Sequence, residues 1–319
     1  MGDFSMVRAI ELVLRTWPFT VLRLIVYGAI TAGLIVAVSV GAGLGWGIGH
    51  VGGADFRQTA TLWGGVIGFG LTFAALWSFR EYLLYLLTAG HVAAMTLAAE
   101  ARDLPGGRAQ IAFALAEVKA RFGEIHLLFV LDQAVKGAVG AVTGLLDGIG
   151  RMTGLVGLQG PMRLVGAVLR LSTTFLDELV LAREIRLRSQ DPWTTAREGV
   201  VLYAQNAPMV LKNAVWLTAL RWIGAGIVFV LAAAPAAAAV WIVPGPTTGW
   251  ALMVSLALAI GLQRALIDPF CIACLMQVWE RRIEGQTPDP VWDARLAEVS
   301  RPFRELIERA RSAFTSKTT

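Results

Sequence analysis

Apolar runs long enough to cross a lipid bilayer recur along the chain. The run from 19 to 48, for example, contains a single charged residue, Arg23. About 20 apolar residues in a helix match the roughly 30 Å hydrocarbon core of a bilayer. Of the 319 residues, 56% are hydrophobic and 16% are charged, against about 45–50% and about 25% in soluble domains. The sequence therefore predicts an all-α, polytopic membrane protein.

We expect residues 1–286 to form a membrane domain, a bundle of about six transmembrane helices. The expected spans are 19–48, 60–87, 125–149, 164–182, 214–243 and 250–278. The second helix should continue beyond the bilayer, because Thr88–Ala101 keeps a helical composition without a breaker.

Lysine and arginine fall mainly on one side of these spans. The segments 1–18, 99–123, 183–213 and 279–319 hold 19 of them, whereas 49–59 and 150–163 hold 3. Cytoplasmic loops carry the excess of basic residues in membrane proteins. We therefore expect a multi-pass protein of a bacterial-type inner (plasma) membrane, with both termini in the cytoplasm.

Three segments on the cytoplasmic side have the amphipathic pattern of helices that lie along a membrane surface. They are Phe4–Arg15, Arg108–Arg121 and Pro192–Gln205. Each precedes two spans, so the membrane domain is predicted to contain three units, each an amphipathic helix followed by a helical hairpin. Membrane lipids are therefore expected partners.

Residues 287–319 are expected to form a cytoplasmic amphipathic C-terminal helix and a short tail. Apolar residues recur at helical spacing over Val291–Phe314. Pro302 either kinks this helix or begins a second helix behind Ser300. Two roles remain open for this segment: packing under the membrane domain, or binding a protein partner.

Glycines spaced four residues apart occur in three series. They are Gly41, Gly45 and Gly49; Gly64 and Gly68; and Gly140, Gly144 and Gly148. In lipid, small residues let helix backbones approach one another, and this close packing drives helix association. The three series predict close packing between helices of the same chain.

Two of the predicted spans contain a pair of opposite charges away from their ends. Asp132 and Lys136 are opposite in charge and four residues apart, as are Arg264 and Asp268. Each pair therefore shares a helix face and can neutralise itself. Pro269 removes one backbone donor and leaves a carbonyl one turn earlier without its helical partner. The pairs act either as locks between helices or as the lining of a polar cavity near the bilayer midplane.

The surroundings of these charges follow from their positions along the helices. The face that carries Asp132 and Lys136 continues into the glycine series that ends at Gly148, so it is expected to meet another helix. Arg221 lies within about two turns of the cytoplasmic end of its span, and its long side chain is expected to reach the interface.

The sequence contains no evident catalytic or metal-binding set. His50, His91 and His126 are far apart, and the basic residues form no tract with interleaved aromatics. Cys271 and Cys274 have CxxC spacing but lie in an apolar run, without the strand context of thioredoxin-like chemistry. We expect no enzymatic activity, no cofactor, no metal ion and no nucleic-acid partner.

Two stretches of the second half resemble segments of a known family. LDQAVK (131–136) is similar to a family helix with a Gln and a following basic residue, which map onto Gln133 and Lys136. IDPFCIACLMQVWERRIEG (267–285) is similar to the last span of the family, which maps onto Asp268 and Gly285. The order of features over roughly 122–285 resembles the membrane core of the choline transporter-like family. The resemblance implies a carrier-like fold and a choline- or ethanolamine-type solute.

Two functions remain open. In the first, a permease moves a small polar or cationic solute through a midplane cavity, and its helices bend at Pro269 and at the glycine series 140–148. The side chains that would face the pathway are Asp132, Gln133, Lys136, Arg264 and Asp268. In the second, a non-transporting organising or assembly protein uses its cytoplasmic amphipathic helices to hold a partner or to shape the bilayer.

Overall fold

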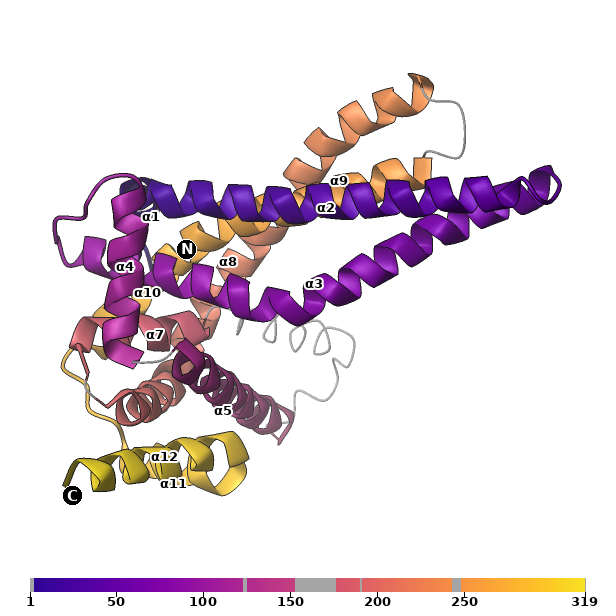
Figure 1. The fold of residues 1–319 in the computed structure, drawn as a ribbon. Helices are drawn as coiled ribbons and strands as arrows, with labels where there is room; N and C mark the ends of the chain where they lie inside the picture. Colours follow the sequence, from indigo (N-terminus) through magenta and orange to yellow (C-terminus); the bar gives the residue numbers. More distant parts are fainter. Residues whose placement is uncertain (1–2, 123–124, 153–175, 190, 243–247, 319) are drawn as a thin grey trace. The chain divides into compact units, whose positions relative to one another are not determined.

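Every element of secondary structure that the structure describes is a helix, so the predicted all-α class is confirmed (Figure 1). The structure is a computed structural model, and it describes residues 3–122, 125–152, 176–189, 191–242 and 248–318. Three helical segments in this part are long and apolar enough to cross a membrane: Trp17–Gly49, Pro192–Leu231 and Ser255–Ile283. The expected six spans are not confirmed, and most of the expected span 164–182 lies outside the described residues.

The chain divides into two compact units. The first, here called the hairpin unit, consists of Thr20–Leu87 and Ile223–Ile267. The second, here called the charged unit, consists of Met1–Phe19, Thr88–Trp222 and Asp268–Thr319. Besides the helix Trp17–Gly49, whose first three residues belong to the charged unit, two long helices run from one unit into the other. They are α3 (Ala54–Ala99), which extends past the expected span as predicted, and α8 (Pro192–Ile242).

In the hairpin unit, α2 (Trp17–Gly49) and the first part of α3 lie side by side near the turn that joins them (Figure 1). Their glycines make this approach possible. A Cβ atom on Gly41 would overlap the carbonyl oxygen of Gly64, and one on Gly64 would overlap that of Gly41. A Cβ atom on Gly45 would overlap the carbonyl oxygen of Ala60. The predicted close packing is therefore confirmed for the first two glycine series.

The rest of the hairpin unit is the second part of α8, followed by α9 (Thr248–Leu262) and a π-helical turn, η2 (Gln263–Ile267). The chain then continues in the charged unit as α10 (Asp268–Ile283). The expected last span, 250–278, is thus a helix interrupted by a π-turn.

The charged unit is built around the first part of α8. Five consecutive residues there, from Val200 to Ala204, are each at most 2% exposed. A helix that is buried on all sides needs apolar residues all round, and this segment supplies them. The expected interfacial helix over 192–205 is instead the buried first part of α8, so the third predicted unit of amphipathic helix plus hairpin does not have the expected layout.

Shorter helices surround this core. They are α1 (Met6–Arg15), α4 (Arg108–Phe122), α5 (Ile125–Met152) and α7 (Leu176–Leu187). Helix α1 begins at Ser5, whose hydroxyl accepts a hydrogen bond from the backbone N–H of Arg8. The segments 4–15 and 108–121 therefore form separate helices close to the predicted bounds.

The C-terminal segment forms two helices, α11 (Pro290–Val299) and α12 (Arg301–Thr318). Ser300 separates them, and its hydroxyl accepts a hydrogen bond from the backbone N–H of Phe303 at 3.2 Å. This confirms the alternative in which a second helix begins behind Ser300. Leu296, Phe303 and Leu306 are fully buried, so the apolar faces of both helices pack within the charged unit.

Candidate functional site

The charges of the predicted third span lie on α5, within the charged unit. The side chain of Asp132 is 4% exposed, that of Lys136 is 46% exposed, and their Oδ2 and Nζ atoms are 2.7 Å apart. The predicted pairing on one helix face is therefore confirmed. Gln133 lies on the exposed side of the same helix.

The stripe continues into the glycine series Gly140, Gly144 and Gly148. Gly140 and Gly144 are exposed, and among the described residues no heavy atom lies within 4 Å of a Cβ placed on either. The surroundings of Gly148 lie outside the described residues. No described side chain or backbone segment packs against Gly140 or Gly144, so both the helix packing and the hinge role of this series remain predictions.

Helix α12 covers another side of α5. A Cβ atom on Gly137 would lie 2.7 Å from Cγ of Pro302, so the glycine that permits this approach is outside the predicted series. The opposite side of α12 is exposed and carries Arg301, Arg304 and Glu308. Helix α5 therefore packs against a helix whose exposed charged side chains would be unfavourable in the hydrocarbon core of a bilayer.

Asp268 pairs with Arg221 and not with the predicted partner, Arg264. Nε of Arg221 lies 2.9 Å from Oδ1 of Asp268, and both side chains are about 10% exposed. The pair joins α8 to α10 across 47 positions of sequence. The guanidinium of Arg221 is buried against this carboxylate, and its position relative to a membrane interface remains a prediction.

The π-turn explains why Arg264 and Asp268 do not pair as predicted. Residues four apart share a face only in an α-helix, and the wider π-helical turn over 263–267 changes that register. In a π-turn, the carbonyl of Arg264 would accept a hydrogen bond from residue 269, but Pro269 has no N–H. The guanidinium of Arg23 donates to this carbonyl at 3.2 Å, so the predicted unpaired carbonyl finds a side-chain donor.

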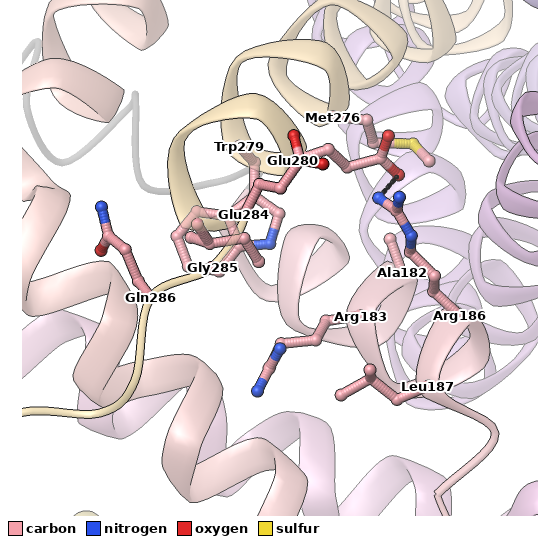
Figure 2. Close-up of a pocket in the computed structure, with 11 residues that line it drawn as sticks. Ala182, Arg183, Arg186, Leu187, Met276, Trp279, Glu280, Glu284, Gly285 and Gln286 are labelled. Atoms are coloured by element: carbon pink, nitrogen blue, oxygen red, sulfur yellow. Dashed lines mark ion pairs between the residues drawn. The ribbon is translucent and has the colours of Figure 1, made fainter.

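A cleft of about 240 Å³ opens in the charged unit between α7 and the end of α10. It is lined by Ala182, Arg183, Arg186, Leu187, Met276, Trp279, Glu280, Ile283, Glu284, Gly285 and Gln286. Figure 2 shows Arg186 reaching from α7 toward Glu280, with 3.2 Å between Nη1 and Oε1. Arg183 extends beside the cleft, and its Nη2 donates to Oε2 of Glu198 at 3.0 Å.

Sequence reasoning missed this cleft. Its α7 side follows directly on the predicted span 164–182, and its α10 side comprises the end of the last predicted span and the residues after it. The dense charges of AREIRLR (182–188) were a usable signal that α7 leaves the apolar environment. Helix α7 contacts α10 in the tertiary structure, and no pattern in the sequence indicates this contact.

Beside the cleft, Glu184 of α7 is 2% exposed, and its Oε1 has no hydrogen-bond partner among the described residues. Burial raises the pKa of this carboxyl group well above its ordinary value of 4.5; Arg183 opposes the rise, whereas Asp191 and Glu198 add to it. Folding therefore favours the protonated carboxyl group. Its contribution to the free energy of unfolding is complete at a pH below the ordinary pKa and is lost as the pH rises toward the folded-state pKa.

We expect Glu184→Gln to be more stable than the wild type at pH 8, with a smaller difference at pH 5. Glutamine keeps the shape of the side chain and cannot ionise, so it avoids the cost of a buried charge. Each 1 kcal/mol gained would raise Tm by about 2–4 °C in a unit of this size. Thermal unfolding at both pH values measures the effect, and Glu298→Gln, at an exposed position of α11, is the control. An equal Tm change at both pH values would contradict the assignment.

Within the described part of the chain, no three His, Cys, Asp or Glu side chains come together in a group that could hold a metal ion. Cys271 and Cys274 are both buried and do not form a disulfide. The absence of enzymatic activity and of a cofactor remains a prediction.

Comparison of the chain with protein-family models, with curated proteins and with solved structures found no match. The resemblance to the choline transporter-like family therefore rests only on the residues quoted above.

Proposed function

We propose that this chain is a membrane-anchored docking protein. The hairpin unit crosses the bilayer four times as two helical hairpins, and the charged unit forms a helical domain in the cytoplasm that holds a partner. This is the second of the two functions that the sequence left open, a non-transporting organising or assembly protein. It differs from that prediction in crossing the bilayer four times and not six.

The distribution of charge supports this division. The formally charged residues of the hairpin unit are Arg23, Asp55, Arg57, Arg80, Glu81 and Arg264. All other charged residues belong to the charged unit. Large apolar side chains such as Leu44, Leu71 and Val230 are exposed on the hairpin unit, as expected of helices that face lipid.

Helix lengths agree with crossings that end near the π-turn. The segments 223–242 and 248–267 contain about 20 residues each, which span about 30 Å as helices. The burial of side chains by protein also indicates that the crossings end near the π-turn. In the candidate span Ser255–Ile283, 61% of the most apolar window is buried by protein, against 17% in Trp17–Gly49. Helix α10 itself has ten buried residues out of 16, which supports a position covered by protein.

The observation that carries the proposal is the packing of α12 on α5. Helix α12 exposes Arg301 and Arg304 on the side away from its buried apolar residues. Each arginine costs at least roughly 2.5–3.5 kcal/mol at the centre of a bilayer. Since α5 packs against this helix, we place α5 outside the hydrocarbon, where Lys136 can reach water.

The carrier interpretation is the second candidate, and the π-turn favours it. Such turns are frequent at functional sites, and here the turn comes with the buried guanidinium of Arg23. In a carrier, Asp132, Gln133, Lys136 and Asp268 would face the solute, and α5 would cross the bilayer with Gly144 near its outer end.

The side from which α5 can be labelled separates the two candidates. In a background with Cys271→Ala and Cys274→Ala, we expect Gln133→Cys and Gly144→Cys to react with a membrane-impermeant maleimide in inverted vesicles. Glu308→Cys, at an exposed position of α12, is the positive control. Gly33→Cys and Gly70→Cys, at exposed positions of the hairpin unit, should react only after detergent is added. Labelling of residue 144 from the periplasmic side of intact cells would refute the docking proposal and favour six crossings.

A further inference from the structure

Two of the residues that line the cleft between α7 and α10 carry a buried hydrogen-bond donor without an acceptor among the described residues. Trp279 is 1% exposed, and its indole Nε1 has no hydrogen-bond partner among the described residues. Nε of Arg183 is also buried without a partner there. A buried donor left without an acceptor is unfavourable, because it has lost its hydrogen bond to water. Both groups can only donate, so the group that would satisfy them is an acceptor.

The two donors favour a negatively charged acceptor. The guanidinium of Arg183 is a permanent cation whose fork matches the oxygens of a carboxylate or a phosphate. Its Nη2 is engaged by Glu198, which leaves the Nε edge for a ligand. Trp279 supplies a second, neutral donor on the same cleft.

The lining of the cleft also includes acidic side chains. Glu284 lines it from the residues just after α10, is exposed, and has no ion-pair or hydrogen-bond partner in the described part of the chain. Glu280 is already neutralised by Arg186. An exposed carboxylate on the lining is suited to an ammonium group, and Met276, Leu187 and Ile283 contribute apolar lining.

The size of the cleft limits the ligand. Sites for drug-sized molecules enclose about 300–1,000 Å³, whereas this cleft encloses about 240 Å³. A molecule with the dimensions of an amino acid or of a phospholipid headgroup fits this volume.

We propose that this cleft binds a small zwitterion, whose carboxylate or phosphate accepts hydrogen bonds from Arg183 and Trp279 and whose ammonium group pairs with Glu284. The proposal rests on the charged unit alone, so it does not depend on how many times the chain crosses the membrane. Binding here would make the cytoplasmic domain responsive to a soluble metabolite or to a lipid headgroup.

Calorimetric titration of the full chain in detergent tests the proposal. The probes are O-phosphoethanolamine, β-alanine, inorganic phosphate and ethanolamine. We expect one of the two zwitterions to bind with a stoichiometry near one and more tightly than phosphate or ethanolamine alone. Competition by a short-chain phosphatidylethanolamine would assign the ligand to a headgroup, and its absence to a soluble molecule. Absence of binding by both zwitterions at millimolar concentration would overturn the proposal.

Variants locate the binding site. Trp279→Phe and Arg183→Lys each remove one unpartnered N–H, and each should raise the Kd of the zwitterion about five- to tenfold, the effect of one hydrogen bond. Trp292→Phe and Arg281→Lys are the matched controls, since neither residue lines the cleft. An unchanged Kd in both cleft variants would overturn the assignment.

Glu284→Gln provides a test that does not disturb the core, because Glu284 is exposed. It should weaken binding of the zwitterion and leave binding of inorganic phosphate unchanged. Equal weakening of both probes, or of neither, would show that the ammonium group is not recognised at this position.

Discussion

Arg221→Met is expected to lower the free energy of unfolding of the charged unit by about 3–5 kcal/mol, because it leaves the buried carboxylate of Asp268 without its partner. The two side chains are about 10% exposed, and their charged atoms approach to 2.9 Å. Such a loss would lower Tm by roughly 6–20 °C at about 2–4 °C per kcal/mol. Thermal unfolding of the purified protein, followed by circular dichroism, measures it.

The double variant Arg221→Met with Asp268→Leu is the decisive control. It removes both charges, and replacement of a whole buried ion pair by apolar side chains is often neutral or stabilising. We therefore expect its Tm to return close to that of the wild type. Arg264→Met should have a much smaller effect, since Asp268 pairs with Arg221 and the carbonyl of residue 264 accepts the bond from Arg23. A larger loss for Arg264→Met than for Arg221→Met would restore the pairing predicted from sequence.

Gly41→Leu is expected to separate α2 from α3 and to destabilise the hairpin unit by about 3 kcal/mol or more, at or above the upper end of the range for overpacked cores. Even a single Cβ at this position would overlap the carbonyl oxygen of Gly64. A backbone carbonyl cannot move aside as the end of a flexible side chain can. The change should appear as a lower Tm and as faster proteolysis of the purified protein.

Gly43→Leu is the matched control for this variant. It lies two residues along the same helix, and no heavy atom lies within 4 Å of a Cβ placed there. Its helix propensity changes by the same amount, so any difference between the two variants reports the contact with α3. Equal Tm values for the two would contradict the close packing of α2 and α3 through their glycines.

Local sequence signals predicted the helical class and several details correctly. The i, i+4 spacing identified the Asp132–Lys136 pair, since both residues lie on one regular α-helix. Glycines spaced by four identified the faces of α2 and α3 that meet. Ser300 and Pro302 together indicated the start of α12. In each case the signal depends on neighbours within one or two helical turns.

Predictions from residue spacing and composition failed where a segment far away in the sequence determines the contacts of a side chain or helix. Spacing paired Asp268 with Arg264, but a π-turn changes the register between them, and Arg221 of α8 supplies the partner. The segment 192–205 resembles an interfacial helix, yet it forms the buried core of the charged unit because other helices surround it. Apolar composition is compatible with burial in lipid or in protein, and hydropathy does not distinguish the two.

The long apolar helices, the helix starts and the glycine faces were therefore determined by the sequence itself, because helix geometry places residues three or four apart on one face whatever else surrounds them. Only the tertiary structure decided that α12 covers α5 and that α7 faces the end of α10. Those contacts join segments that are far apart in the chain. Asp132 and Lys136 could be read as a pair from their spacing, but whether that pair faced hydrocarbon or a protein surface depended on the distant helix that packs against α5.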